Sequence, residues 1–163
     1  MKNTTTDAHR GVDSDRARRT GSPLVTGAIW IGLTLTVVAT IVPYVDRATS
    51  DALAAHIRAG YPTYSRQRIE TAADIYLAYL TLVGVAGIAA RIWTARAIRA
   101  GKRWARPAAT ATFVIATCVA LTDLFVKDTS GDTGLPPLIG VIGLVPFLPG
   151  LLVITLLWIG EQP

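Results

Sequence analysis

The chain has 163 residues with a net charge of +5, and 51% of its residues are hydrophobic. Its only cysteine, Cys118, excludes an internal disulfide and CxxC redox chemistry. Its two histidines, His9 and His56, lie outside the apolar stretches, which excludes an intramembrane bis-histidine haem site. No metal-ligand spacing occurs, so we expect neither a metal nor a cofactor.

Residues 1–22 are polar and mixed in charge, and we expect a disordered cytoplasmic tail there. Four apolar stretches without an ionisable residue at their centres follow, at residues 24–45, 75–90, 108–126 and 135–160. Crossing a bilayer core of about 30 Å takes about 20 helical residues. The sequence therefore predicts an all-α membrane protein whose residues 23–163 form one four-transmembrane-helix bundle. Its spans are expected at about 24–45, 71–93, 107–126 and 135–160.

Between the first two spans, residues 51–59 are expected to form a short external amphipathic helix capped by Thr49 or Ser50. Leu53 and Ile57 are four residues apart, which gives this helix one narrow apolar stripe. We expect it either on the membrane surface or over the outer end of the bundle.

Small residues recur at intervals of four along spans one and three, and span two contains two nearby glycines. Such spacing lets helix backbones approach closely, which favours helix association in a bilayer. The positions are Gly32, Thr36 and Thr40, then Gly84 and Gly87, then Thr112, Ala116 and Ala120.

Span four contains two prolines near its middle, Pro146 and Pro149. Each proline removes a backbone donor, so we expect a kink there. Two interpretations stay open: a broken helix that lines a binding site, as in some transporters, or a kink that only serves packing.

The connection between spans two and three carries basic residues and no acid: Arg91, Arg96, Arg99, Lys102, Arg103 and Arg106. Basic connections stay cytoplasmic, so we expect both termini inside and residues 46–70 and 127–134 outside. The same six residues are candidate contacts for anionic lipid headgroups. Frequent alanine and arginine with three lysines suggest a bacterial source, and hence a multi-pass protein of the bacterial plasma membrane.

Two carboxylates, Asp74 and Asp123, lie inside the apolar stretches near the outer boundary. A carboxylate in a membrane is a candidate functional group, so a ligand or proton site is one interpretation. That site would comprise Asp74, Asp123, Glu70, Arg66, Tyr61 and Tyr64. The other interpretation is a pair of interfacial carboxylates, neutralised by Arg66, Arg68 or Lys127.

The layout of the chain is that of span one, a short external helix, the Gly60-Tyr61-Pro62 segment, a span two containing Val83-Gly84-Val85-Ala86-Gly87, and two further spans. In this layout the chain resembles the DoxX-like four-helix membrane proteins. The resemblance implies a carboxylate near the start of span two, which would be Asp74 or Glu70. The roles it implies are mixed: some members are accessory subunits of quinone-linked oxidoreductases, and many have no known role.

We favour a non-enzymatic role, as an accessory or structural subunit of a membrane complex. Its partners would then be the bilayer with its anionic lipids and other membrane proteins or further copies of the chain. The alternative is a small-solute or proton-coupled carrier, or a quinone-binding subunit, that uses Asp74 and Asp123. Nucleic-acid binding is not expected, because the predicted topology accounts for the net charge.

Overall fold

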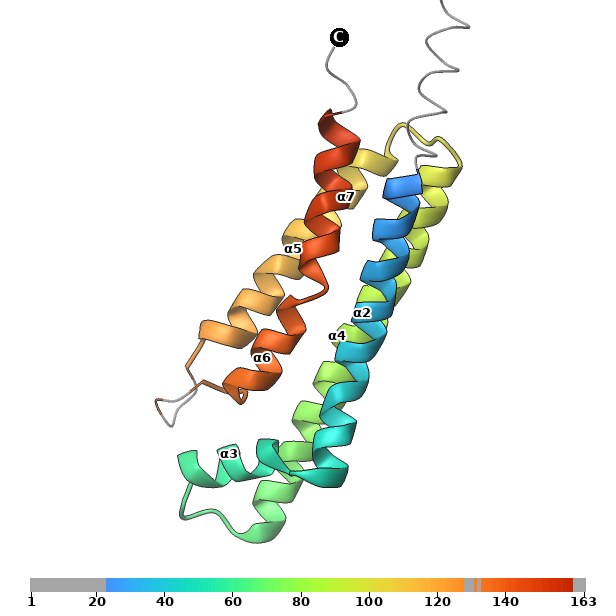
Figure 1. The fold of residues 1–163 in the computed structure, drawn as a ribbon. Helices are drawn as coiled ribbons and strands as arrows, with labels where there is room; N and C mark the ends of the chain where they lie inside the picture. The colour runs from blue at the N-terminus through green and yellow to red at the C-terminus, as the bar shows by residue number, and fades with distance from the viewer. Residues whose placement is uncertain (1–22, 128–130, 132, 160–163) are drawn as a thin grey trace, which may run out of the picture.

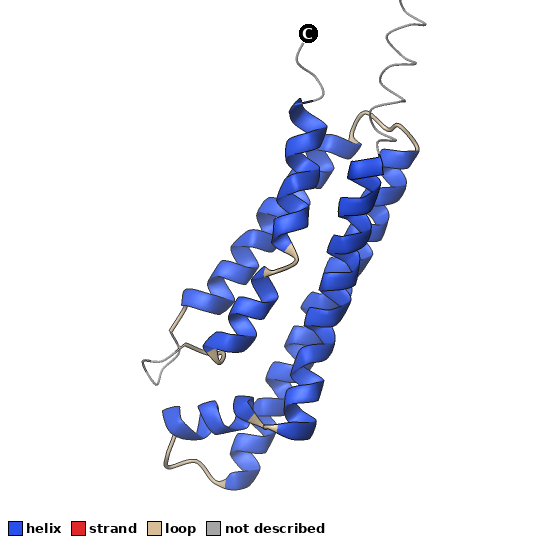
Figure 2. Cartoon of the chain, viewed as in Figure 1, coloured by secondary structure: helices blue, strands red, loops and turns tan. Residues whose placement is uncertain are grey.

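The computed structural model describes residues 23–127, 131 and 133–159 (Figure 1). Its helices are α2 (Pro23–Thr49), α3 (Ala52–Gly60), α4 (Arg66–Arg99), α5 (Ala105–Phe125), α6 (Pro137–Leu144) and α7 (Phe147–Ile159). In the part of the chain that is described, the only strand-like pairing is one isolated bridge between Lys127 and Thr133, so the fold is all-α (Figure 2). The predicted tail, residues 1–22, lies outside the described residues.

Four helical segments are long and apolar enough to cross a membrane, which confirms the prediction at the level of helix length and composition. They are α2, α4, α5 and the pair α6–α7, with 27, 34, 21 and 23 residues. At about 1.5 Å per residue, the shortest of them is about 30 Å long. α4 is longer than its predicted span and extends beyond the apolar stretch at both ends.

α2 runs alongside α4, and α5 lies beside α6 and α7 (Figure 1). The buried apolar residues form two clusters, one at each end of the bundle. The cluster near the α4–α5 connection contains Ala28, Ala97, Ile98, Ala105, Ala109, Val153 and Leu157. The cluster at the opposite end, here called the α3 end, contains Leu53, Ala54, Ile57, Ile69, Ala73, Leu135 and Ile139.

α3 covers the α3 end of the bundle, where Leu53 and Ile57 are buried in the second cluster. Its first turn is capped by a residue that the sequence did not indicate. The Asp46 carboxylate accepts hydrogen bonds from the backbone amides of Ala52 and Leu53, each at 3.1 Å. The expected cap by Thr49 or Ser50 is therefore wrong. Asp46, near the end of α2, accepts from the free amides, while the hydroxyls of Thr49 and Ser50 donate to Val45 and Asp46.

The small residues of α2 and α4 meet at the contact between these helices. A Cβ atom on Gly84 would overlap the side chain of Thr40, and one on Gly87 would lie 3.5 Å from Thr36 Cγ2. Close approach of the two backbones thus depends on the absence of a side chain at Gly84, whereas a methyl group at Gly87 would make an ordinary contact.

Span four is divided into α6 and α7 by a turn at Val145 and Pro146. The Val145 amide donates to the Ile142 carbonyl at 3.2 Å, and the Leu148 amide donates to the Val145 carbonyl at 3.3 Å. Both bonds reach three residues back, so the turn is tighter than an α-helix. Pro146 and Pro149 supply no N–H, which leaves the local ladder incomplete.

Candidate functional site

The guanidinium of Arg91 lies inside the bundle, between α2 and α7. Its Nη2 atom donates to the carbonyl oxygen of Pro146 at 2.6 Å. A Cβ atom on Gly32 would lie 2.6 Å from Arg91 Nη1, and one on Gly150 would lie 3.7 Å from Nη2. The absence of a side chain at Gly32 on α2 therefore makes the space that the guanidinium occupies, and Gly150 on α7 lies beside it.

This placement gives the turn in span four a donor from another helix. Carbonyl groups freed at a helix break must find partners inside the bundle, because lipid supplies none. Among the described residues, Arg91 forms no ion pair with a carboxylate. An unneutralised cation among apolar helices is costly to bury, and such groups commonly mark ligand or ion sites.

The α5 side of this region is aromatic. Phe113 of α5 packs edge-on against Phe147 of α7, with ring centroids 5.8 Å apart. A Cβ atom on Gly150 would lie 3.1 Å from the Phe113 ring. The site thus joins one cation and one backbone carbonyl to an apolar wall.

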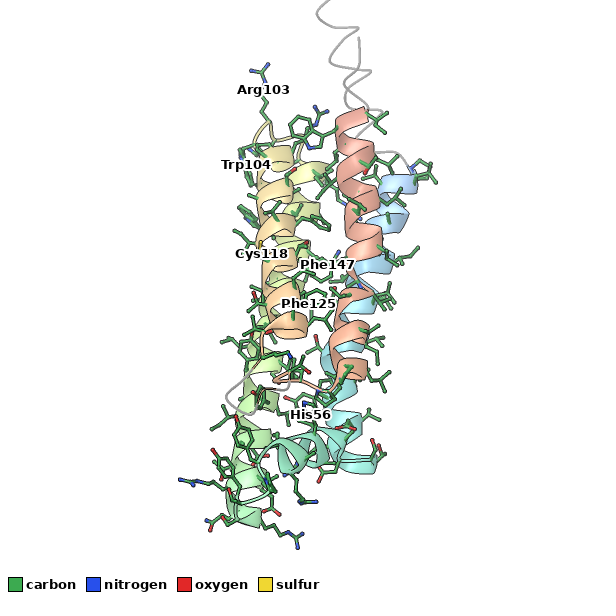
Figure 3. All side chains as sticks on the ribbon, turned by 90° about the vertical axis from the view of Figure 1, so that its left-hand side faces the viewer. His56, Arg103, Trp104, Cys118, Phe125 and Phe147 are labelled. Atoms are coloured by element: carbon green, nitrogen blue, oxygen red, sulfur yellow. The ribbon has the colours of Figure 1, made fainter. Side chains whose placement is uncertain are left out.

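Arg91 differs from the other basic residues with which the sequence grouped it. Arg96, Arg99, Lys102 and Arg103 are exposed, and Arg106 is half-buried. Figure 3 shows Arg103 projecting from the end of the bundle beside Trp104. These positions suit headgroup contact, whereas the Arg91 guanidinium is turned into the bundle.

Asp74 and Asp123 have different partners on different helices. Arg47 Nη2 of α2 lies 3.4 Å from Asp74 Oδ1, and the side chain of Asp74 is 66% exposed. The Tyr79 hydroxyl of α4 donates to Asp123 Oδ1 at 2.8 Å. Arg47 is a partner that sequence reasoning missed, although its spacing from Asp51, with which it also pairs at 2.8 Å, could have drawn attention to it.

The remaining predicted site residues lie at the α3 end, where Tyr61 and Tyr64 pack half-buried against the second cluster. The rings of Tyr61 and Tyr64 are stacked at 4.7 Å, and the Arg68 guanidinium lies 5.0 Å from the Tyr64 centroid. Arg66 pairs with Glu70 at 2.9 Å. The predicted site is thus brought together in parts: the tyrosines, the Arg66–Glu70 pair and each aspartate have their own contacts.

Within the described ranges, no group of three or more His, Cys, Asp or Glu side chains could hold a metal ion. Comparison with known proteins finds no matching family model, no matching curated protein and no matching solved structure. The resemblance to DoxX-like proteins stays a prediction from the layout of the sequence.

Proposed function

We propose that this protein is a multi-pass protein of the bacterial plasma membrane that acts as a non-catalytic accessory subunit of a larger membrane assembly. Both termini and the α4–α5 connection would face the cytoplasm. The observation that supports the accessory role is the outward face of α4. This helix offers a long apolar surface that the rest of the chain leaves uncovered.

The exposed face of α4 runs for about five turns. Its large apolar side chains include Ile75, Leu82, Val85 and Trp93, which are 65%, 70%, 55% and 53% exposed. Exposed alanines lie between them, at Ala78, Ala86 and Ala89. None of the residues in the most apolar 18-residue window of α4 is buried within the chain.

The alanines favour a protein partner over lipid alone on this face. Inside a bilayer, association depends on van der Waals packing, and small residues let a partner helix come close. Large side chains on both sides of the alanines then supply contact area to the approaching helix. Under the resemblance to DoxX-like proteins, the partner would be a subunit of a quinone-linked oxidoreductase.

Native mass spectrometry after gentle extraction from the source membrane tests the accessory role. The wild-type chain is expected in a larger assembly, and Ala86→Phe is expected to release it, because the ring blocks close approach. Ala111→Phe adds the same ring to an exposed alanine on α5 and should leave the assembly intact. A wild-type chain recovered only as a bare monomer contradicts the proposal.

A second candidate function is a small-solute or proton-coupled carrier, or a quinone-binding subunit. It is supported by the divided span four with the Arg91 guanidinium at its turn. Interrupted helices with a charged group beside them line binding sites in many transporters. The polar groups available to such a site are then Arg91 and the predicted carboxylates Asp74 and Asp123.

Proteoliposomes separate the two candidate functions. A carrier or quinone-binding subunit should move protons into vesicles that contain a pH-sensitive dye, or should retain added short-chain ubiquinone. The double variant Asp74→Asn/Asp123→Asn and the single variant Arg91→Gln should each reduce this activity, whereas Arg96→Gln should not. If the wild-type protein does neither, the proton-coupled and quinone-binding forms of the second candidate are wrong.

A further inference from the structure

A groove of about 400 Å³ runs along the surface between α2 and α6. Its apolar walls are formed by Val38, Ile41 and Val45 of α2 and by Leu138, Ile139 and Ile142 of α6. Several of these side chains are exposed, among them Val38 and Leu138 at 49% and 70%. The volume lies within the range of about 300–1,000 Å³ that is typical of ligand pockets.

One end of the groove is polar and carries a negative charge. Asp46, Thr49 and Ser50 line it where α2 passes into α3. The Asp46 carboxylate accepts from the Ser50 hydroxyl at 2.6 Å and from the two amides of the α3 cap. A carboxylate can accept about four hydrogen bonds, so capacity for one more donor is left.

No described basic side chain forms an ion pair with Asp46. The neighbouring Arg47 is held by Asp51 and Asp74 instead. The uncompensated charge at the mouth of the groove is therefore negative, and it favours a cationic hydrogen-bond donor.

We propose that the groove holds one acyl chain of a phospholipid whose headgroup carries a primary ammonium, such as phosphatidylethanolamine. The ammonium donates to Asp46, and the chain lies along α2 from Val45 towards Val38. Val38 lies eight positions before Asp46 on the same helix, which gives about 12 Å of apolar wall below the carboxylate. Asp46 directly follows the apolar stretch 24–45, at the depth where a headgroup begins.

This proposal rests on the proposed membrane location and is independent of the accessory or carrier role. Location is checked first: the wild-type chain should stay with membranes through an alkaline carbonate wash. Release by the wash would contradict the location, whereas loss of lipid selectivity in a chain that stays in the membrane contradicts the groove proposal alone.

The test uses the full chain in vesicles of equal parts phosphatidylethanolamine, phosphatidylcholine and phosphatidylglycerol. After extraction in a mild detergent, native mass spectrometry counts the lipids that stay bound. The wild-type chain should retain one phosphatidylethanolamine. Phosphatidylcholine has no N–H donor and phosphatidylglycerol is anionic, so neither should replace it.

Asp46→Asn should lower retention of phosphatidylethanolamine about tenfold, because the charge-assisted hydrogen bond is lost. Glu70→Gln is the matched control, since Glu70 lies at the same end of the bundle, pairs with Arg66 and does not line the groove. Asp46 also caps α3, so Asp46→Asn could fail to fold. A second pair of variants, one inside the groove and one outside it, then tests the proposal. Val38→Trp fills the groove and should remove the lipid, whereas Val37→Trp, on the adjacent residue outside the groove, should not.

Three results would overturn the proposal. The first is a wild-type chain without bound lipid, and the second is equal retention of all three phospholipids. The third is unchanged retention of phosphatidylethanolamine in both Asp46→Asn and Val38→Trp.

Discussion

The hydroxyl of Tyr79 donates to the Asp123 carboxylate, whereas the hydroxyl of Tyr44 pairs with that of Thr81 at 2.6 Å. Both contacts join neighbouring helices through one tyrosine. They differ in the chemistry of the partner, because a carboxylate is a stronger acceptor than a neutral hydroxyl when it is ionised. Comparing the two tyrosines therefore reports on the charge of Asp123.

We expect Tyr79→Phe to lower the free energy of unfolding in detergent by about 1.5 kcal/mol, the lower end for a hydrogen bond to a charged group, since both side chains are partly exposed. Tyr44→Phe should lower it by about 0.5 kcal/mol. Equal losses in the two variants would indicate that Asp123 is neutral in the folded protein. Chemical denaturation of each purified variant supplies the measurement.

The direction of the Arg91 side chain could not be predicted from the sequence pattern. It directly follows the apolar stretch 75–90 and is the first of a run of basic residues. Its charge and its place in the sequence are therefore those of a residue that contacts lipid headgroups. Its side chain turns inward because Gly32 leaves space and the Pro146 carbonyl accepts a hydrogen bond. Gly32 lies on α2 and Pro146 in the turn between α6 and α7, and nothing in the spacing along span two indicates either residue.

At the scale of helices, the α2–α4 contact has little freedom to adjust. The Thr40 hydroxyl donates to the Thr36 carbonyl at 2.7 Å, which fixes the side chain that Gly84 faces. A methyl group added at Gly84 must therefore displace a side chain already held by its own helix, or move the helices apart.

Gly84→Ala is expected to lower the free energy of unfolding by about 1–3 kcal/mol, as overpacking does in other interiors. Gly27→Ala is the control, because a Cβ atom there would meet nothing within 4 Å. Adding Thr40→Ala to Gly84→Ala should recover much of the loss. Additive losses in the double variant would show that the two side chains do not meet.

α3 is held by its apolar stripe, and its docking can be tested separately from the bundle. Ile57 is buried against the second cluster, while Arg58 beside it is exposed. Ile57→Ala should cost about 2–4 kcal/mol of docking and raise hydrogen exchange of the α3 amides. Arg58→Ala should leave exchange near the wild-type level, and equal protection in both variants would contradict the docked position.

The existence of α3 was predictable from the i, i+4 spacing of Leu53 and Ile57, and its position was left between two alternatives. What decides between them is contact with Ile69 on the next helix and with Leu135, which is distant in the sequence. The hydrogen bond between His56 Nε2 and the Thr133 carbonyl, at 2.6 Å, adds a second tie to the α5–α6 connection. Such contacts follow from the assembled bundle and leave no periodic signal.

At the scale of the whole molecule, the number of long apolar helices was predictable because length and hydropathy are local properties. The pairing of helices was not, because apolar faces towards lipid and towards protein have similar compositions. The candidate site is divided for the same reason: its predicted members could be grouped only if the pairing of the helices were known. Arg66 and Glu70 share a helix and their pairing follows from spacing, whereas Asp74 and Asp123 meet residues of other helices.

The two ends of the bundle differ in a way that predicts orientation. Arg103 and Trp104 lie at one end, and His56 lies at the other (Figure 3). The α4–α5 end carries exposed basic residues without an acid between them, whereas arginines of the α3 end pair with Asp51, Asp74 and Glu70. Because the distribution of basic residues sets topology, the α4–α5 end should be cytoplasmic.

Cysteine labelling with a membrane-impermeant maleimide tests this orientation in a Cys118→Ser background. Thr63→Cys, in the exposed α3–α4 connection, should react on intact cells, and Lys102→Cys, in the exposed α4–α5 connection, should react only after permeabilisation. The reverse labelling pattern would show that the protein has the opposite orientation in the membrane. It would place the Asp46 mouth of the α2–α6 groove in the cytoplasmic leaflet, so the lipid that occupies the groove would come from that leaflet. Labelling of both positions on intact cells would contradict the four-span arrangement, because an odd number of crossings separates residues 63 and 102.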